Sequence, residues 1–282
     1  MSFLEAVILG IAQGLTEFLP VSSSGHLRII PALFGWEDPG AAFTAVTQLG
    51  TVAAVVIYFR KDLWRIVSTW VRSLFDPDLR SELDARMGWY LILATIPISV
   101  FGLVFKDTIE DGARDLRIVG TTLIVLGLVL HIAEKVGKQE RSIHDVDAKA
   151  AAGIGFAQAL ALIPGVSRSG STISAGLFMG FTREGAARFS FLLSIPAVVL
   201  SGLFTLPDIT AGDGPGVAET AVATALAFIV GYAAIAWFLK YLTSHTTLLF
   251  VVYRIGLGVL VLTLVATGTI AAQDPGSLLS TP

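Results

Sequence analysis

The sequence has no cysteine and few charged residues. Its 282 residues include 19 Lys or Arg, 22 Asp or Glu and 4 His, and charged residues make up 15% of the chain. The lack of cysteine excludes disulfides, thiolate nucleophiles and cysteine-ligated metal sites. Soluble domains carry about 25% charged residues, so this chain has too little polar surface for a water-soluble enzyme. The net charge of −3, without a basic stripe, argues against nucleic acid as a partner.

Long apolar stretches take the place of that charge. Residues of the hydrophobic types make up 54% of the chain, and its mean hydropathy is +0.76. A stretch of about 17–25 apolar residues crosses the hydrocarbon core of a bilayer. Six stretches meet this length: 41–59, 89–105, 117–134, 186–206, 217–239 and 247–271. The sequence therefore predicts an all-α polytopic membrane protein in which residues 1–282 form a single integral membrane domain.

Two further apolar regions, 3–36 and 150–181, are interrupted in the middle. The first break, at residues 20–26, and the second, at residues 164–172, are rich in Ser, Gly and Pro. Non-helical backbone at membrane depth is tolerated only where protein or water satisfies its polar groups. We therefore expect both regions to be re-entrant helix hairpins, and we call the two breaks the first tip and the second tip.

The distribution of Lys and Arg predicts the orientation of the chain. Segments 60–88 and 135–149 are rich in basic residues, whereas 207–216 and 273–282 contain none. Because basic loops are retained on the cytoplasmic side, the first two segments are expected to be cytoplasmic and the last two external. By alternation, the connection 106–116 is also expected outside.

The chain contains an internal repeat. Residues 10–42 align without a gap on residues 155–187, and the alignment places the first tip on the second. Each hairpin is followed by three predicted spans, which divides the chain into halves at about 1–134 and 150–271. With the predicted orientation, the hairpins enter from opposite faces, as in inverted-topology repeats whose broken helices meet near the midplane.

The two hairpins carry polar side chains at or just before their breaks. These are Gln13, Glu17, Ser22, Ser23, Ser24 and His26 in the first, and Gln158, Ser167, Arg168, Ser169, Ser171 and Thr172 in the second. Hydroxyls and helix N-terminal N–H groups suit phosphate oxygens, and Arg adds a forked cation. A charged side chain at the midplane costs on the order of 3 kcal/mol. Placing Glu17, His26 and Arg168 together there predicts a site for an anion and an associated cation.

Other interpretations of the same residues stay open. Serine and glycine in membrane helices often serve close packing, and Glu17 and Arg168 would also form an ion pair that only ties the halves together. Broken helices in inverted repeats are typical of secondary transporters, so a polyprenyl-phosphate flippase or an anion transporter is an alternative function. A transporter would not need Glu17 and His26 beside a phosphate site.

Both motifs resemble those of a known family. The segments Gln13-Gly-Leu-Thr-Glu-Phe-Leu-Pro-Val-Ser-Ser-Ser-Gly-His26 and Pro164-Gly-Val-Ser-Arg-Ser-Gly-Ser-Thr172 are similar to the two signatures of undecaprenyl-diphosphate phosphatases of the bacitracin-resistance (BacA) type. The resemblance covers essentially the whole chain. It implies hydrolysis of undecaprenyl diphosphate to undecaprenyl phosphate and inorganic phosphate, which recycles the lipid carrier of cell-wall synthesis and confers bacitracin resistance. It also implies a bacterial plasma-membrane location, an active site that opens to the outer face, and a divalent cation, Mg²⁺ or Ca²⁺.

The resemblance also suggests roles for individual residues. Glu17 matches the catalytic acid and is the expected cation ligand, Ser23 and His26 match the two candidate nucleophiles, and Arg168 matches the phosphate-clamping arginine. Ser23 activated by His26 is favoured, and the choice stays open. The expected substrate-binding residues are Gln13, Ser22, Ser24, Ser167, Ser169 and Thr172.

Gln13 stands where many family members have a second Glu, which puts in doubt any mechanism that needs two carboxylates here. The expected partners are the polyprenyl diphosphate substrate and membrane lipids, with no nucleic acid, and a homo-oligomer is left open.

Overall fold

The structure, a computed structural model, describes residues 1–105, 115–209 and 216–273. Their regular secondary structure is helical apart from one isolated bridge between Arg141 and Phe181. The helices are α1 (Phe3–Phe18), α2 (Ser23–Phe34), α3 (Gly40–Tyr58), α4 (Arg60–Ser73), α5 (Leu83–Val104), α7 (Leu116–Val136), α8 (Ala148–Ala159), α9 (Arg168–Phe178), α10 (Arg183–Ile209), α11 (Val217–Leu242) and α12 (Leu248–Ala266), with short 3₁₀ turns η1 (Pro77–Ser81), η2 (Ile143–Asp145) and η3 (Leu160–Leu162). The prediction of an all-α polytopic membrane protein is confirmed.

The helices that are long and apolar enough to cross a membrane agree with most of the predicted spans. They are α5, α7, α11 and α12, and α3 with α4 adds a fifth if this pair, bent by 78°, counts as one span. The predicted span 186–206 lies inside the helix α10, and its membrane crossing stays a prediction. Most of the predicted connection 106–116 lies outside the described residues.

Both interrupted regions are two helices separated by a break, as predicted. In the first, α1 ends at Phe18 and α2 begins at Ser23; in the second, α8 and η3 are followed by a turn and by α9. The two helices of each hairpin pack against each other. The re-entrant position of the hairpins in a membrane stays a prediction.

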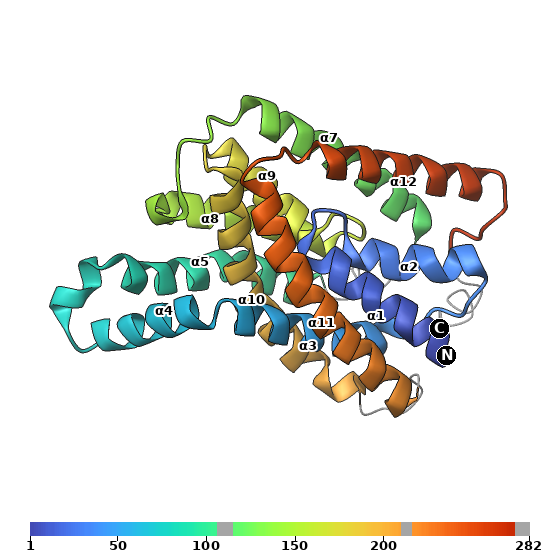
Figure 1. Cartoon of the computed structure of the whole chain (residues 1–282), viewed down its shortest axis with the longest axis horizontal. Coiled ribbons are helices and arrows are strands. Elements are labelled where there is room, and N and C mark those ends of the chain that lie inside the picture. Colours follow the sequence, from blue (N-terminus) through green and yellow to red (C-terminus); the bar gives the residue numbers. More distant parts are fainter. Residues whose placement is uncertain (106–114, 210–215, 274–282) are drawn as a thin grey trace.

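Equivalent helices of the two halves make equivalent contacts. α1 packs on α11, and α8 packs on α5 (Figure 1). A Cβ at Gly10 would stand 2.5 Å from the carbonyl oxygen of Ala223, and a Cβ at the aligned Gly155 would stand 2.5 Å from that of Ala94. Only glycine permits such close approach of helix backbones in a membrane protein. The internal repeat therefore extends to local packing, while its inverted orientation stays a prediction.

The remaining helices surround the hairpins. α11 crosses α1 and α3, α7 and α12 lie side by side along one edge, and α4 and α5 form an antiparallel pair that projects from the body (Figure 1). The start of α8 is fixed by Asp147, its N-cap. The Ala150 N–H and the Arg141 guanidinium, which both donate to this carboxylate, hold the pKa of Asp147 below its ordinary value.

Candidate active site

Four donors converge on the buried carboxylate of Glu17, near the end of α1. Its Oε1 accepts hydrogen bonds from Arg168 Nη2 (2.6 Å) and Gln48 Nε2 (3.2 Å). Its Oε2 accepts from Ser23 Oγ (2.6 Å) and Gln13 Nε2 (3.1 Å). Glu17 is 6% exposed, and these donors come from α1, α2, α3 and α9. The structure thus brings predicted site residues of both hairpins onto one carboxylate.

Arg168 is placed at the start of α9, at the position that Ser23 holds at the start of α2. The guanidinium donates to Glu17 through Nη2 and to the carbonyl oxygen of Ser194 through Nη1 (3.0 Å). Arginine has five N–H donors, so these two bonds leave others for a ligand. The side chain is 13% exposed, which keeps its charge in a poorly solvated place.

The helices α2 and α9 begin in the same unusual way. Their N-cap residues, Ser22 and Ser167, have positive φ angles of 76° and 70°, and each Oγ accepts the N–H three residues further on. The same hydroxyls pair with those of Ser24 (3.3 Å) and Ser169 (3.2 Å). Non-glycine residues in this strained backbone region cluster at functional sites. The first N–H groups of each helix have no intrahelical acceptor, and such groups bind anions.

The two tips are also linked through one arginine side chain. Arg254, on α12 and fully buried, donates from Nη1 to the carbonyl oxygen of Pro20 (3.0 Å) and from Nη2 to those of Gly165 (3.1 Å) and Val166 (3.0 Å). Its Nε donates to the carbonyl oxygen of Leu123 on α7 (3.2 Å). One guanidinium therefore satisfies backbone carbonyls from both breaks, where no helix provides a partner.

Two of the predicted substrate-binding hydroxyls, those of Ser169 and Thr172, also contact other segments of the protein. Ser169 Oγ donates to the carbonyl oxygen of Leu19 (2.9 Å), a second link between the tips. Thr172 Oγ1 donates to the carbonyl oxygen of Arg168 (2.8 Å) and lies 2.6 Å from Ser190 Oγ. These contacts attach α9 to its neighbours, so in this structure both hydroxyls hold the second tip in place.

The expected contact between Ser23 and His26 is not formed. Ser23 donates to Glu17 instead, and the two ring nitrogens of His26 lie near Ser22 O (2.7 Å) and Tyr253 Oη (2.6 Å). Helix geometry explains the difference, because residues three apart near a helix start need not place their side chains toward each other, and Glu17 reaches Ser23 from the preceding helix.

Sequence reasoning missed three residues that contact the site. Arg254 carried a usable signal, because an ionisable residue inside a predicted span is a candidate functional residue by default. Gln48, a polar residue in the span 41–59, carried a weaker one. Tyr253 carried none, because tyrosine is common in membrane helices and only the fold places it beside His26.

A layer of buried aromatic rings lies on one side of Glu17. Phe18, the next residue, packs edge-on against Phe191 (ring centroids 5.3 Å apart), and Phe191 packs against Phe59 (6.4 Å). The Arg188 guanidinium lies over the Phe59 ring at 5.4 Å. Each of these phenylalanines is 1% exposed. These contacts connect the residue next to Glu17 with the region around Arg188.

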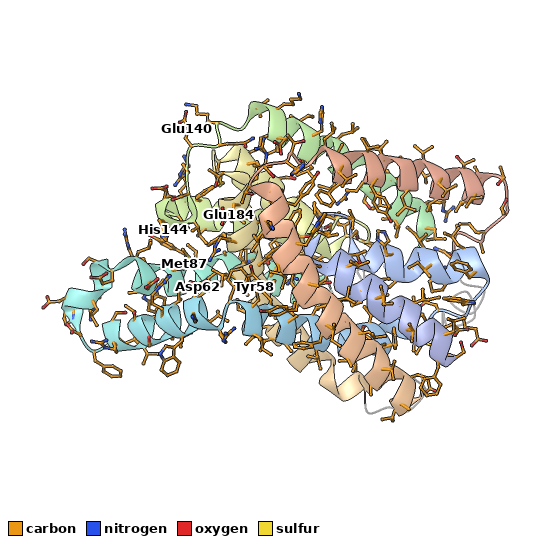
Figure 2. The ribbon with its side chains drawn as sticks, viewed as in Figure 1. Tyr58, Asp62, Met87, Glu140, His144 and Glu184 are labelled. Carbon is orange, nitrogen blue, oxygen red and sulfur yellow. The ribbon has the colours of Figure 1, made fainter. Side chains whose placement is uncertain are left out.

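That region holds a cavity of about 430 Å³ where α4, α5, η2 and α10 meet. Figure 2 labels four residues that line it, Asp62, Met87, His144 and Glu184. Its charged side chains pair with one another, since Arg188 bonds Asp62 (3.0 Å) and Arg65 bonds Asp84 (2.6 Å). The cavity adjoins the two basic segments, so it belongs to the side predicted to be cytoplasmic.

The residues around Glu17 fit a divalent cation only in part. The Oε1 atom of Gln13 is buried and has no hydrogen-bond partner, which leaves an amide oxygen beside a carboxylate. Within the described residues, no group of three or more His, Asp or Glu is arranged to hold a metal. Mg²⁺ is commonly bound through one or two carboxylates together with substrate phosphates and water. The donor set therefore suits a cation held jointly with a phosphorylated substrate.

Comparisons with known proteins identify the family of this chain. Residues 6–260 match the family model described as bacitracin resistance protein BacA. The chain belongs to the BacA family. It is 56% identical over 273 residues to a Nocardioides protein named undecaprenyl-diphosphatase, which covers 96% of this chain and 100% of that one. It is also 56% identical over 277 residues to the Mycolicibacterium smegmatis protein of that name (97% and 100%), and 53% identical over 274 residues to the Thermobifida fusca protein (97% and 94%).

We expect Arg254→Met to destabilise this BacA-family chain strongly. The substitution leaves carbonyls of both tips buried without donors, at about 1–3 kcal/mol for each unsatisfied group. Thermal unfolding in detergent, together with the yield of monodisperse protein, measures the loss. Arg117→Met is the matched control, because the Arg117 side chain is 62% exposed and pairs with Asp115, two residues away, rather than with either tip. Equal unfolding temperatures for the two variants would contradict the conclusion that Arg254 stabilises the fold by bonding carbonyls of both tips.

Proposed function

We propose that this protein is a phosphatase that hydrolyses undecaprenyl diphosphate to undecaprenyl phosphate and inorganic phosphate, and so recycles the lipid carrier of cell-wall synthesis. The name shared by its close relatives supports this activity. The observation that carries it is the contact of one buried carboxylate, Glu17, with both a hydroxyl nucleophile, Ser23, and a guanidinium, Arg168. Bacitracin resistance, for which the family is named, follows from an abundant supply of the recycled carrier.

The two tips provide the groups that a diphosphate requires. The free donors of Arg168 and the first N–H groups of α2 and α9 are suited to the oxygens of the terminal phosphoryl group. The hydroxyls of Ser22, Ser24 and Ser167 lie at the same helix starts. Because the donors are held in place before the substrate binds, they stabilise the charge that develops during transfer without reorganisation. The isoprenoid chain stays in the lipid.

Ser23 is the nucleophile in this mechanism, and Glu17 is its base. As Ser23 Oγ bonds to the terminal phosphorus, its proton moves to Glu17 and the bond from phosphorus to the bridging oxygen breaks, which releases undecaprenyl phosphate. Water then attacks the phosphoserine. Glu17, which has passed the first proton to the departing undecaprenyl phosphate, takes a proton from this water and returns it to Ser23 Oγ as inorganic phosphate leaves. The 2.6 Å hydrogen bond from Ser23 to Glu17 supports this assignment over a His26 base.

Glu17 and the Gln13 amide oxygen would hold a divalent cation, Mg²⁺ or Ca²⁺, together with the diphosphate. A bound cation supplies positive charge that bridges phosphate oxygens during transfer. Gln13 is suited to this role because its Oε1 is buried and has no other partner.

The contact between Ser23 and Glu17 also favours an enzyme over the alternative of a flippase or anion transporter. A transporter needs donors for its anion, which Arg168 and the helix starts supply. It has no need for a hydroxyl placed against a carboxylate in the geometry of a nucleophile and its base.

The site is proposed to open to the outer face of the plasma membrane. The rings of Phe18, Phe191 and Phe59 form a chain of contacts from the residue next to Glu17 to the Arg188 guanidinium at the cavity. That cavity adjoins the basic segments, which are expected in the cytoplasm, so the packed rings support entry of the substrate from the opposite side.

The activity is tested by phosphate release from a polyprenyl diphosphate by purified protein in lipid-supplemented detergent. We expect release that EDTA abolishes and that Mg²⁺ or Ca²⁺ restores. Glu17→Gln and Arg168→Lys should each lower kcat/KM by about 10²–10³-fold, because each removes charge or geometry that acts in the transition state.

The matched controls are Glu134→Gln and Arg183→Lys. Glu134 and Arg183 form another largely buried pair, on α7 and α10, away from both tips. If these controls keep the wild-type kcat/KM, then the lower kcat/KM of the Glu17 and Arg168 variants is not caused simply by the loss of a buried ion pair. Rapid quenching with labelled substrate should trap an acid-stable phosphoserine. An acid-labile phosphoenzyme would instead identify His26 as the nucleophile. If the intact protein releases no phosphate, the phosphatase proposal fails and the flippase or anion transporter becomes the favoured function.

The orientation can be measured with single cysteines, because the chain has none of its own. We expect Ser24→Cys, at the exposed start of α2, to react with a membrane-impermeant maleimide added outside intact cells. His144→Cys, at the exposed cavity rim, should react only after the membrane is permeabilised. The unsubstituted chain is the control for background labelling. The reverse pattern would contradict an outward-opening site.

A further inference from the structure

His26 is held at both ring nitrogens. Its Nδ1 lies 2.7 Å from the carbonyl oxygen of Ser22, and its Nε2 lies 2.6 Å from the phenolic oxygen of Tyr253. The two ring planes are within 6° of each other. His26 is on α2, inside the first tip, and Tyr253 reaches it from α12.

The chemistry of these partners determines the tautomer. A carbonyl oxygen only accepts hydrogen bonds, so Nδ1 must carry a proton and donate to Ser22. In the neutral imidazole, Nε2 then carries no proton, and its lone pair accepts a hydrogen bond from the O–H of Tyr253. In the imidazolium, Nε2–H donates to the same phenolic oxygen. Tyr253 is thus a partner for His26 in either protonation state.

Tyr253 is the more exposed member of this pair. His26 is 6% exposed, whereas Tyr253 is 45% exposed. The next residue, Arg254, bonds backbone carbonyls of both tips. The position of α12 that allows these bonds therefore also places Tyr253 beside His26. The charged groups around the tips are Glu17 on α1, Arg168 on α9 and Arg254 itself.

We infer that Tyr253 is a positioning residue for the reaction: it occupies Nε2 of His26, which keeps that nitrogen from attacking phosphorus, and it holds the imidazole against the carbonyl oxygen of Ser22 at the start of α2. The inference rests on the proposed phosphatase activity.

The test compares Tyr253→Phe with the wild-type chain. We expect kcat to fall about tenfold, the equivalent of losing one buried hydrogen bond, because His26 and the start of α2 that carries Ser23 are then held less firmly. KM should stay within about twofold, because the phenol does not contact substrate. In protein labelled with ¹⁵N at histidine, the His26 Nε2 resonance should move toward the position of an unbonded imidazole nitrogen, with Nδ1 still protonated.

Tyr232→Phe is the matched control. Tyr232, on α11, is 38% exposed and packs against Tyr58, away from both tips. It should leave kcat, KM and the histidine spectrum unchanged, and a His26→Gln sample assigns the resonance among the four histidines.

A folded Tyr253→Phe protein with an unchanged His26 spectrum and wild-type kcat would overturn the inference, as would a fall in kcat/KM that came from KM alone. If the wild-type chain releases no phosphate, the proposed function fails. The ¹⁵N spectra then still show whether His26 Nε2 is hydrogen-bonded to Tyr253.

Discussion

The ion pair between Glu17 and Arg168 is the interaction on which the site depends, because it is made across the two halves of the chain. Burying two charges costs several kcal/mol each unless further hydrogen bonds satisfy them. Glu17 receives such bonds from Gln13, Gln48 and Ser23, and Arg168 reaches a backbone carbonyl of α10. The pair is therefore well satisfied where it lies, and it brings together the Ser23 hydroxyl, the Glu17 carboxylate and the Arg168 guanidinium, which we propose as nucleophile, base and phosphate-binding group.

The interrupted helices explain why the site lies at this point. A break in a buried helix exposes carbonyls and N–H groups that must find partners. Carbonyls of both tips accept from Arg254, and the Gly25 and Gly170 N–H groups donate to the N-cap hydroxyls, while the N–H groups before them in α2 and α9 have no intrahelical acceptor. The carbonyls of the two broken helices thus help to hold the tips together, and their first N–H groups are the ones that we propose bind an anion.

Much of this arrangement could be predicted from the sequence, because local signals determined it. The breaks at 20–26 and 164–172 interrupt apolar regions, and their alignment predicted equivalent breaks; that Ser22 and Ser167 cap the helices that follow is seen only in the structure. Contacts that depend on packing could not be predicted. The pairing of Ser23 with Glu17, rather than with His26, depends on how α1 meets α2, and the places of Tyr253 and Arg254 depend on the register of α12.

A double-mutant cycle on Glu17 and Arg168 tests the central claim most directly, that the two hairpins form one site. Single-turnover phosphate release would be measured for Glu17→Gln, Arg168→Lys and the double variant, with the Glu134 and Arg183 variants as a parallel cycle. If the residues act as one unit, the double variant should lose little more activity than the worse single variant. Losses that multiply, as for independent sites, would contradict the account.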